Sequence, residues 1–256
     1  MVVKVAMDGA KYLYKAAVLD TQLTNGSSGR RRLGRTFMDS DLLEYMQAHD
    51  QHAPDLPQWT SPEPREAISW FAGVRAPWWI AGGWAIDLFL RKQTRIHLDL
   101  DVGVLRRDLT EILSMLKSWE IFEAKDGALS PLADGILPRS EVNSLWCRRS
   151  SDGPWMLELM LDDAEGENWV YRRDREVRQR LRDALCPDAS GILHLAPEIQ
   201  LLYKSKSVRP KDEADFRLTL PHLGAEARQW LLKSLLQRSP LHPWLAEISP
   251  SDSVQP

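Results

Sequence analysis

The sequence contains little cysteine and no long apolar run. Only Cys147 and Cys186, among 256 residues, are cysteines, and they lie far apart. They form neither a C-x-x-C metal motif nor the paired set of a disulfide-rich fold. A reducing, cytoplasmic environment is therefore expected. No apolar run approaches the roughly 20 residues that cross a bilayer, so no membrane partner is expected, and no signal peptide is predicted.

An excess of charge of one sign is also missing. The chain has 33 Lys and Arg residues and 36 Asp and Glu residues, which gives a formal net charge of -3 at pH 7. This balance argues against a general nucleic-acid-binding protein, because such proteins carry a basic surface. It does not exclude a small anionic ligand held by a few local cations.

The order of sequence patterns predicts an α+β fold with a helical C-terminal part. Residues 1–60 read as an N-terminal extension, partly flexible, with a helix predicted over residues 39–50. Helical and strand-like patterns alternate over residues 61–175. Helical patterns dominate residues 176–248, and residues 249–256 read as a disordered tail.

The most informative stretch is GGWAIDLFLRKQTRIHLDLDV, residues 82–102. Its second half alternates with period two and predicts a strand over residues 96–105. Alternation would place two sets of side chains on opposite faces, the apolar set towards the core. The polar set is Arg95, His97, Asp99 and Asp101, and the apolar set is Ile96, Leu98, Leu100 and Val102.

Two carboxylates two residues apart on one face have two explanations. The strand can be an edge strand whose acidic face is solvated. Alternatively, a divalent cation neutralises both, and Mg²⁺ favours carboxylates together with phosphate oxygens. Gly82 and Gly83 support the second explanation, since they end a short apolar strand and begin a helix. Unpaired backbone N–H groups at such a helix start favour an anion.

The segment WWIAGGWAIDLFLRKQTRIHLDLDV resembles the signature of the polymerase-β-like nucleotidyltransferases, and is most similar to the aminoglycoside and lincosamide nucleotidyltransferases. The shared pattern is Gly-Gly-Trp-Ala-x-Asp, then Thr-Arg-x-His, then Asp-x-Asp. The resemblance implies a polymerase-β-like domain with a mixed sheet over residues 61–175, followed by the helical C-terminal subdomain. It also implies an NTP donor and Mg²⁺, with two ions expected.

The same resemblance assigns roles to individual residues. Gly82 and Gly83 would cradle the triphosphate, and Asp99 and Asp101 would hold Mg²⁺. Two further residues match family positions beside the metal and are expected to contribute to nucleotide binding; these are Arg95 and His97. One departure is Arg91, which stands where many relatives end the helix with glycine.

A third carboxylate is expected from the strand-like PWMLELMLDD. Glu158 is the only charge within its alternating part, so it needs a partner, and the metal site would supply one. A structural salt bridge to an arginine is the alternative. If Glu158 belongs to the site, it can bind metal and accept the proton of an attacking hydroxyl. Asp162 and Asp163 at the strand end are the other candidates for this role.

The helical segment LAPEIQLLYKSKSVRPKDEADF resembles a C-terminal motif of related nucleotidyltransferases. The resemblance implies that a lysine reaches the triphosphate and that a Lys-Asp pair shapes the nucleotide cleft. Lys204 is favoured over Lys211 as the phosphate contact, although lysines near a helix end are also typical of simple capping. The remaining positions that match the motif are Arg209, Asp212 and Asp215.

These patterns predict a Mg²⁺-dependent nucleotidyltransferase that transfers NMP from an NTP to a hydroxyl of a small aminoglycoside- or lincosamide-like acceptor. An acidic cleft would attract a polycationic aminoglycoside. Two alternatives remain: a toxin-type transferase acting on tRNA or protein, and a non-catalytic nucleotide-binding member. Trp78, Trp79 and Trp84 flank the glycines and can line an acceptor pocket or belong to the core. The sequence indicates no oligomeric state.

Overall fold

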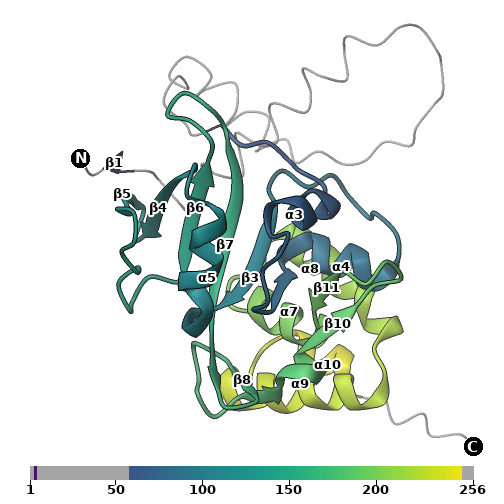
Figure 1. Cartoon of the computed structure of the whole chain (residues 1–256). Coiled ribbons are helices and arrows are strands. Elements are labelled where there is room, and N and C mark those ends of the chain that lie inside the picture. Colours follow the sequence, from purple (N-terminus) through teal and green to yellow (C-terminus); the bar gives the residue numbers. More distant parts are fainter. Residues whose placement is uncertain (1–2, 5–57, 250–256) are drawn as a thin grey trace, which may run out of the picture.

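The computed structural model describes residues 3–4 and 58–249. Most of the N-terminal extension, including the helix predicted over residues 39–50, and residues 250–256 of the tail lie outside the described residues. Within the described part, a mixed sheet carries helices on both faces (Figure 1). The predicted α+β class is confirmed.

Among residues 3–4 and 58–249 the sheet has eleven strands. Their spatial order is β1, β5, β4, β6, β7, β3, β2, β11 and β10, with β8 and β9 branching from β7. Two of its pairings are parallel, β3 with β7 and β11 with β2, and the others are antiparallel. The strands are β1 (Val3–Lys4), β2 (Trp78–Ile80), β3 (Asp101–Leu105), β4 (Glu120–Lys125), β5 (Ala128–Pro131), β6 (Ser144–Arg148), β7 (Trp155–Glu165), β8 (Asn168–Val170), β9 (Arg178–Arg180), β10 (Leu185–Pro187) and β11 (Leu193–Leu195).

Proline positions agree with the observed helix starts. Three helices have proline in the first turn, where its missing N–H costs nothing; these are α3, α7 and α8. Figure 1 shows α7 to α10 gathered at the end of the sheet that carries β11 and β10, away from β4 and β5. The helices are α3 (Pro64–Trp70), α4 (Gly82–Leu90), α5 (Leu109–Met115), α6 (Leu181–Ala184), α7 (Pro197–Lys204), α8 (Pro210–Thr219), α9 (Ala225–Arg238) and α10 (Trp244–Ile248), with 3₁₀ turns η2 (Arg106–Asp108) and η3 (Leu220–His222).

Arg91 caps α4 in the left-handed conformation, with φ of 54°. Glycine adopts this conformation without a Cβ penalty, so the departure from the family pattern places a strained residue here. The Arg91 side chain is exposed. The helix still ends at this point, and the loop that follows it leads to the site.

Alternation along β7 separates the core from the site. Leu157, Leu159 and Leu161 are buried in the cluster beneath α3 and α5. Glu158 and Met160, between them, face the opposite side and line a cavity. The expected period-two pattern of this strand is therefore confirmed, and it places one carboxylate on the cavity side of an otherwise apolar strand.

Two expectations from the sequence are corrected. The strand predicted over residues 96–105 begins only at Asp101, and Ile96 is 53% exposed rather than part of the core. The helical part predicted over residues 176–248 also contains β9, β10 and β11, and β11 pairs with β2 in the central sheet. The two expected parts thus share one sheet, and their division into domains remains a prediction.

No helix among residues 58–249 combines the length and apolarity that a bilayer crossing requires.

The core assignment of β7 predicts a stability difference. Leu159 is 0% exposed, so Leu159→Ala should lower the free energy of unfolding by about 2–5 kcal/mol through a buried cavity. Leu236→Ala on α9, at a residue 48% exposed, is the control and should change it by about 0.5 kcal/mol or less. Urea unfolding measures both. Equal losses would contradict the placement of β7.

Candidate active site

Three carboxylates meet where β3 and β7 run in parallel. Asp101 opens β3 directly opposite Glu158, and the Glu158 N–H donates to the Leu100 carbonyl at 3.0 Å. Asp99 lies two residues before Asp101, ahead of the strand. Each of the three acids offers an oxygen, and these oxygens lie within 4.8 Å of one another. Such a cluster of hard oxygen ligands suits a divalent cation such as Mg²⁺.

Gly82 and Gly83 are required because side chains of the site lie very close to their backbone. Gly82 has φ of +64°, and a Cβ there would lie 1.9 Å from the Asp101 Oδ2 atom. A Cβ on Gly83 would lie 2.1 Å from the Arg95 Nη2 atom and 2.5 Å from the His97 Nδ1 atom. Both glycines therefore make room for side chains of the site.

One expectation for this turn is wrong. The Gly82 N–H is not an unpaired donor, because it donates to Gln200 Oε1 on α7 at 2.8 Å. Gln200 is buried and lines the same cavity, and the sequence reasoning did not single it out.

His97 is fixed by a buried aspartate that the shared sequence pattern contains but to which it assigns no role. Its Nε2 atom hydrogen-bonds Asp87 of α4, which in turn accepts bonds from the Thr94 N–H at 3.1 Å and hydroxyl at 2.5 Å. The Trp84 ring lies against the imidazole, with a centroid distance of 4.3 Å. Burial lowers the pKa of His97 in spite of the bond to Asp87. The available signal was a single acid on the inward side of an otherwise apolar helix.

A buried ion cluster joins α7 and α8 to the loop before β3. The Lys204 Nζ atom lies 3.1 Å from Asp212 and 2.8 Å from Asp215. The guanidinium of Arg95 bonds both oxygens of Asp215 at 3.2 Å, and Arg209 bonds Asp212. Burial alone would raise the pKa of both aspartates, but the hydrogen bonds from these arginines and the charge of Lys204 outweigh it. Both pKa values therefore lie below the usual range.

Lys211, at the start of α8, is the other expected lysine and also lines the cavity. Burial lowers its pKa to about 7, and the neighbouring arginines add to this effect while Asp99 opposes it. The two lysines therefore differ: Lys204 lies between two carboxylates, whereas the charged form of Lys211 is weakened by its surroundings.

Asp162 and Asp163, the other two candidates for the third carboxylate, have separate environments. Asp163 pairs with Arg106 and Arg175 at 3.5 and 3.6 Å and does not line the cavity. Asp162 is buried in the cavity wall, where it accepts bonds from Trp169 and Tyr203. Burial raises the pKa of Asp162.

All nine site residues expected from the sequence line one cavity of about 600 Å³. They are Gly82, Gly83, Arg95, His97, Asp99, Asp101, Glu158, Lys204 and Lys211. The cavity is not the acidic cleft that was expected: four carboxylates line it against seven cationic side chains. The cationic residues are Arg95, Arg172, Arg173, Lys204, Lys206, Arg209 and Lys211.

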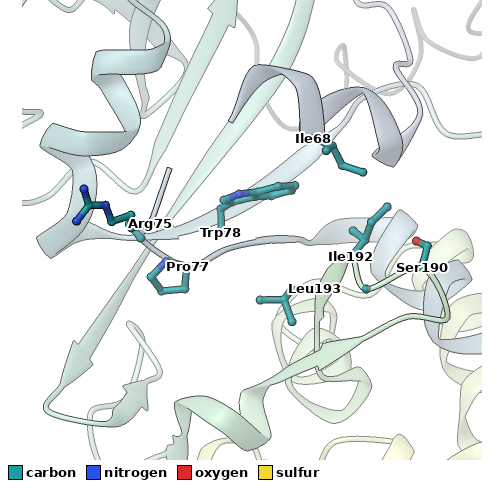
Figure 2. A pocket seen from close by; sticks show the side chains of 9 residues that line it. Ile68, Arg75, Pro77, Trp78, Ser190, Ile192 and Leu193 are labelled. Atoms are coloured by element: carbon teal, nitrogen blue, oxygen red, sulfur yellow. The ribbon is translucent and has the colours of Figure 1, made fainter. Parts of the chain in front are cut away.

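A second cavity, of about 550 Å³, lies between α3, the start of β2 and the turn before β11. Figure 2 shows apolar side chains of Trp78, Ile192 and Leu193 around it, with the Arg75 guanidinium pointing away from them. No carboxylate lines it. Trp79 is a core residue with no exposed surface. Of the three tryptophans near the glycines, Trp84 lies against His97 of the site, Trp78 lines the second cavity, and Trp79 belongs to the core.

The mixed sheet with its helical C-terminal part agrees with the polymerase-β-like nucleotidyltransferase fold that the resemblance in the sequence implies. The chain belongs to the aminoglycoside-2''-adenylyltransferase family, whose model matches residues 65–216.

Individual relatives match over shorter segments. Two 2''-aminoglycoside nucleotidyltransferases, from Escherichia coli and Klebsiella pneumoniae, are each 41% identical over 64 residues, 24% of this chain and 36% of the relative. The match thus spans about a third of these curated relatives. Among solved structures, ANT(2'')-Ia in complex with adenylyl-2''-tobramycin has a TM-score of 0.47 at 18% identity, with 68% of this chain and 95% of that chain covered. Lincomycin-bound LnuA has a TM-score of 0.44 at 15% identity, with 62% and 96% covered.

The ion cluster predicts a pH-dependent stability effect. Asp215→Asn should lower the free energy of unfolding at pH 7 by about 3–5 kcal/mol, because Arg95 and Lys204 each lose a buried partner. Since the pKa of Asp215 is depressed in the folded state, its contribution is present above its unfolded pKa and is lost as the pH falls through the folded value. The difference from wild type should therefore narrow below about pH 4.

Urea unfolding between pH 3 and 7 measures this difference. Glu226→Gln, at an exposed acid of α9, is the matched control and should change the stability little at any of these pH values. A loss in Asp215→Asn that stays constant with pH would show that the carboxylate charge is not responsible.

Proposed function

We propose that this chain transfers a nucleoside monophosphate from an NTP to a hydroxyl of a small, antibiotic-like acceptor. The observation that carries the proposal is the meeting of Asp99, Asp101 and Glu158 in a cavity that is otherwise rich in cations. In the reaction, a bond forms between the acceptor oxygen and the α-phosphorus, and the bond from the α-phosphorus to the bridging oxygen of pyrophosphate breaks. Membership of the family and the similarity to 2''-aminoglycoside nucleotidyltransferases support this reaction class.

The donor set fits Mg²⁺. Asp99, Asp101 and Glu158 would hold the ion or ions, and the missing Cβ of Gly82 lets the Asp101 carboxylate lie against the turn. Bound Mg²⁺ supplies neutralisation of the charge on the transferred phosphoryl group and on the leaving group.

Glu158 is proposed as the acceptor of the hydroxyl proton. Its Oε1 atom accepts a hydrogen bond of 2.7 Å from Ser144 on the neighbouring β6, which orients the carboxylate. Glu158 is 9% exposed, so water competes little for its oxygens. A positioned carboxylate of this kind can remove the proton as the acceptor oxygen attacks.

The cations divide into two proposed groups. Arg95 and Lys204 are bonded to buried carboxylates, so we assign them to holding the cavity wall. Lys211 is assigned to the donor phosphates, because a nearby anion would favour its charged form. The proposal thus reverses the order in which the sequence ranks Lys204 and Lys211. Gly82, Gly83 and His97 are retained as parts of the nucleotide site.

The reaction is tested with labelled ATP, GTP, CTP and UTP, Mg²⁺, and a panel of antibiotics and tRNA. Asp99→Asn, Asp101→Asn and Glu158→Gln should each lower label transfer by about 100-fold or more. The two aspartate variants should keep near-normal stability, since each removes a like-charge repulsion. Asp163→Asn on β7 is the matched control and should stay within about twofold of wild type. Near-normal transfer by Asp99→Asn would sink the proposed site.

The charged residues of the cavity indicate which charge the acceptor should carry. Its carboxylates are the three acids proposed for Mg²⁺ and Asp162, which is already bonded to Trp169 and Tyr203. None of the four is therefore assigned to ammonium groups of an acceptor. Arg95, Lys204 and Arg209 are balanced by Asp212 and Asp215, but Arg172, Arg173 and Lys206 would repel such groups. Between the two antibiotic classes, we favour an acceptor of low positive charge, lincosamide-like rather than polycationic.

This preference predicts an order of acceptors. With the best NTP and Mg²⁺, kcat/KM should be at least about tenfold higher for lincomycin than for tobramycin, which is a difference of about 1.4 kcal/mol. Transfer to tobramycin should rise with ionic strength, because salt screens the repulsion. A preference for tobramycin that weakens with salt would contradict the charge argument, and transfer to tRNA alone would favour the toxin-type alternative.

A further inference from the structure

One arginine of the cavity wall lies beyond the three carboxylates. Arg172 lies two residues after the end of β8 and lines the cavity together with Tyr203 and Asp162. Asp162 lies on the same face of β7 as Glu158, four residues further along the strand. Arg172 therefore lies in the part of the cavity near Asp162, further along β7 than the proposed metal ligand Glu158.

The Arg172 side chain rests on a fixed support. Its guanidinium carbon lies 4.9 Å from the centroid of the Tyr203 ring. The Tyr203 hydroxyl donates to Asp162 at 2.7 Å, and the Trp169 indole donates to the same carboxylate at 3.0 Å. Because the ring is anchored in this way, the guanidinium stacked on it has a defined position before any ligand binds.

Arg172 nevertheless has an unused donor. Its Nη1 atom is shielded from solvent and has no hydrogen-bond partner among residues 58–249. The adjacent Arg173 lines the same cavity but donates to the Tyr171 hydroxyl at 3.1 Å and to the Tyr203 carbonyl at 3.2 Å. A shielded N–H of a charged group without an acceptor is unfavourable. Because Arg172 lines the cavity, a ligand bound there can supply the acceptor.

We propose that Arg172 binds the terminal phosphates of the NTP, the part that leaves as pyrophosphate. This assignment rests on the proposed function, which places the reacting α-phosphate at the three carboxylates. A polyphosphate tail that extends from there along the cavity supplies oxygens for the unused N–H. The planar guanidinium suits two phosphate oxygens at once, and Lys206 and Lys211 add positive charge to the same cavity.

Binding measurements with Mg²⁺ and without any acceptor test the assignment. Dissociation constants are measured by calorimetry for ATP, inorganic pyrophosphate and AMP. Arg172→Met should weaken ATP and pyrophosphate about 10- to 100-fold and leave AMP within about twofold. Arg172→Lys keeps the charge but not the fork, so its loss should be smaller. Arg182→Met, at an exposed arginine of α6, is the matched control and should leave all three constants unchanged.

Each outcome decides between the two claims. If wild type binds ATP and pyrophosphate but Arg172→Met binds them equally well, or loses ATP and AMP to the same extent, the assignment of Arg172 is overturned and the proposed function stands. If wild type binds neither ATP nor pyrophosphate, both fail. Pyrophosphate contains no base, so its result does not depend on which NTP the protein prefers. If Arg172→Met does not fold, unchanged pyrophosphate binding by Arg172→Lys overturns the assignment.

Discussion

The geometry of the cavity depends on a buried cluster in which two aspartates of α8 hold cations from three other segments. Asp215 binds Arg95 of the loop before β3 and Lys204 of α7, and Asp212 binds Lys204 and Arg209. Charges of this kind are costly to bury singly and stable only when they are paired. The cluster therefore fixes where α7 and α8 lie relative to the acids of β3 and β7, and through them the shape of the cavity.

This cluster also determines which cations can serve a ligand. A lysine between two buried carboxylates gains little electrostatic energy by binding a phosphate instead, because its charge is already compensated in surroundings of low dielectric constant. Lys204, which the sequence favours, is in that position. Arg172 and Lys211 differ from Lys204: no described residue accepts a hydrogen bond from the Arg172 Nη1 atom, and burial lowers the pKa of Lys211. Burial and pairing thus separate cations that the sequence alone does not distinguish.

Local patterns were sufficient for the parts of the site that short-range geometry determines. The period-two alternation of β7 identified Glu158, and the glycine pair with the Asp-x-Asp pattern identified the turn and its neighbouring acids. A similar alternation led to a wrong strand prediction over residues 96–100, because β3 begins only at Asp101. Arg95 and His97 are turned inward there by Asp215 and Asp87, and no local pattern shows such pairings. Arg172 was missed for the same reason, since only the fold brings it onto Tyr203.

The short strands between residues 178 and 195 have a similar origin. Each of the three has only three residues, and β9 reads Arg-Gln-Arg, with no apolar alternation to indicate a strand. They form because neighbouring strands offer backbone partners, and β10 and β11 continue the sheet past β2. Pairing across the sheet can override weak local propensity in this way.

The Gly82-Gly83 turn has a different structural role from the one that its sequence suggests. A Gly-Gly pair at a helix start suggests backbone donors waiting for phosphate, yet the first of these donors is bonded to Gln200. What the structure requires of both glycines is the absence of a Cβ, since Asp101 lies against one and Arg95 and His97 lie against the other. Asp215 and Asp87 hold Arg95 and His97 in place. Both side chains lie so close to the backbone of Gly83 that a Cβ at this position would clash with them. Because Gly82 has no Cβ, the Asp101 carboxylate can lie against the turn, within 4.8 Å of the other two acids proposed for Mg²⁺.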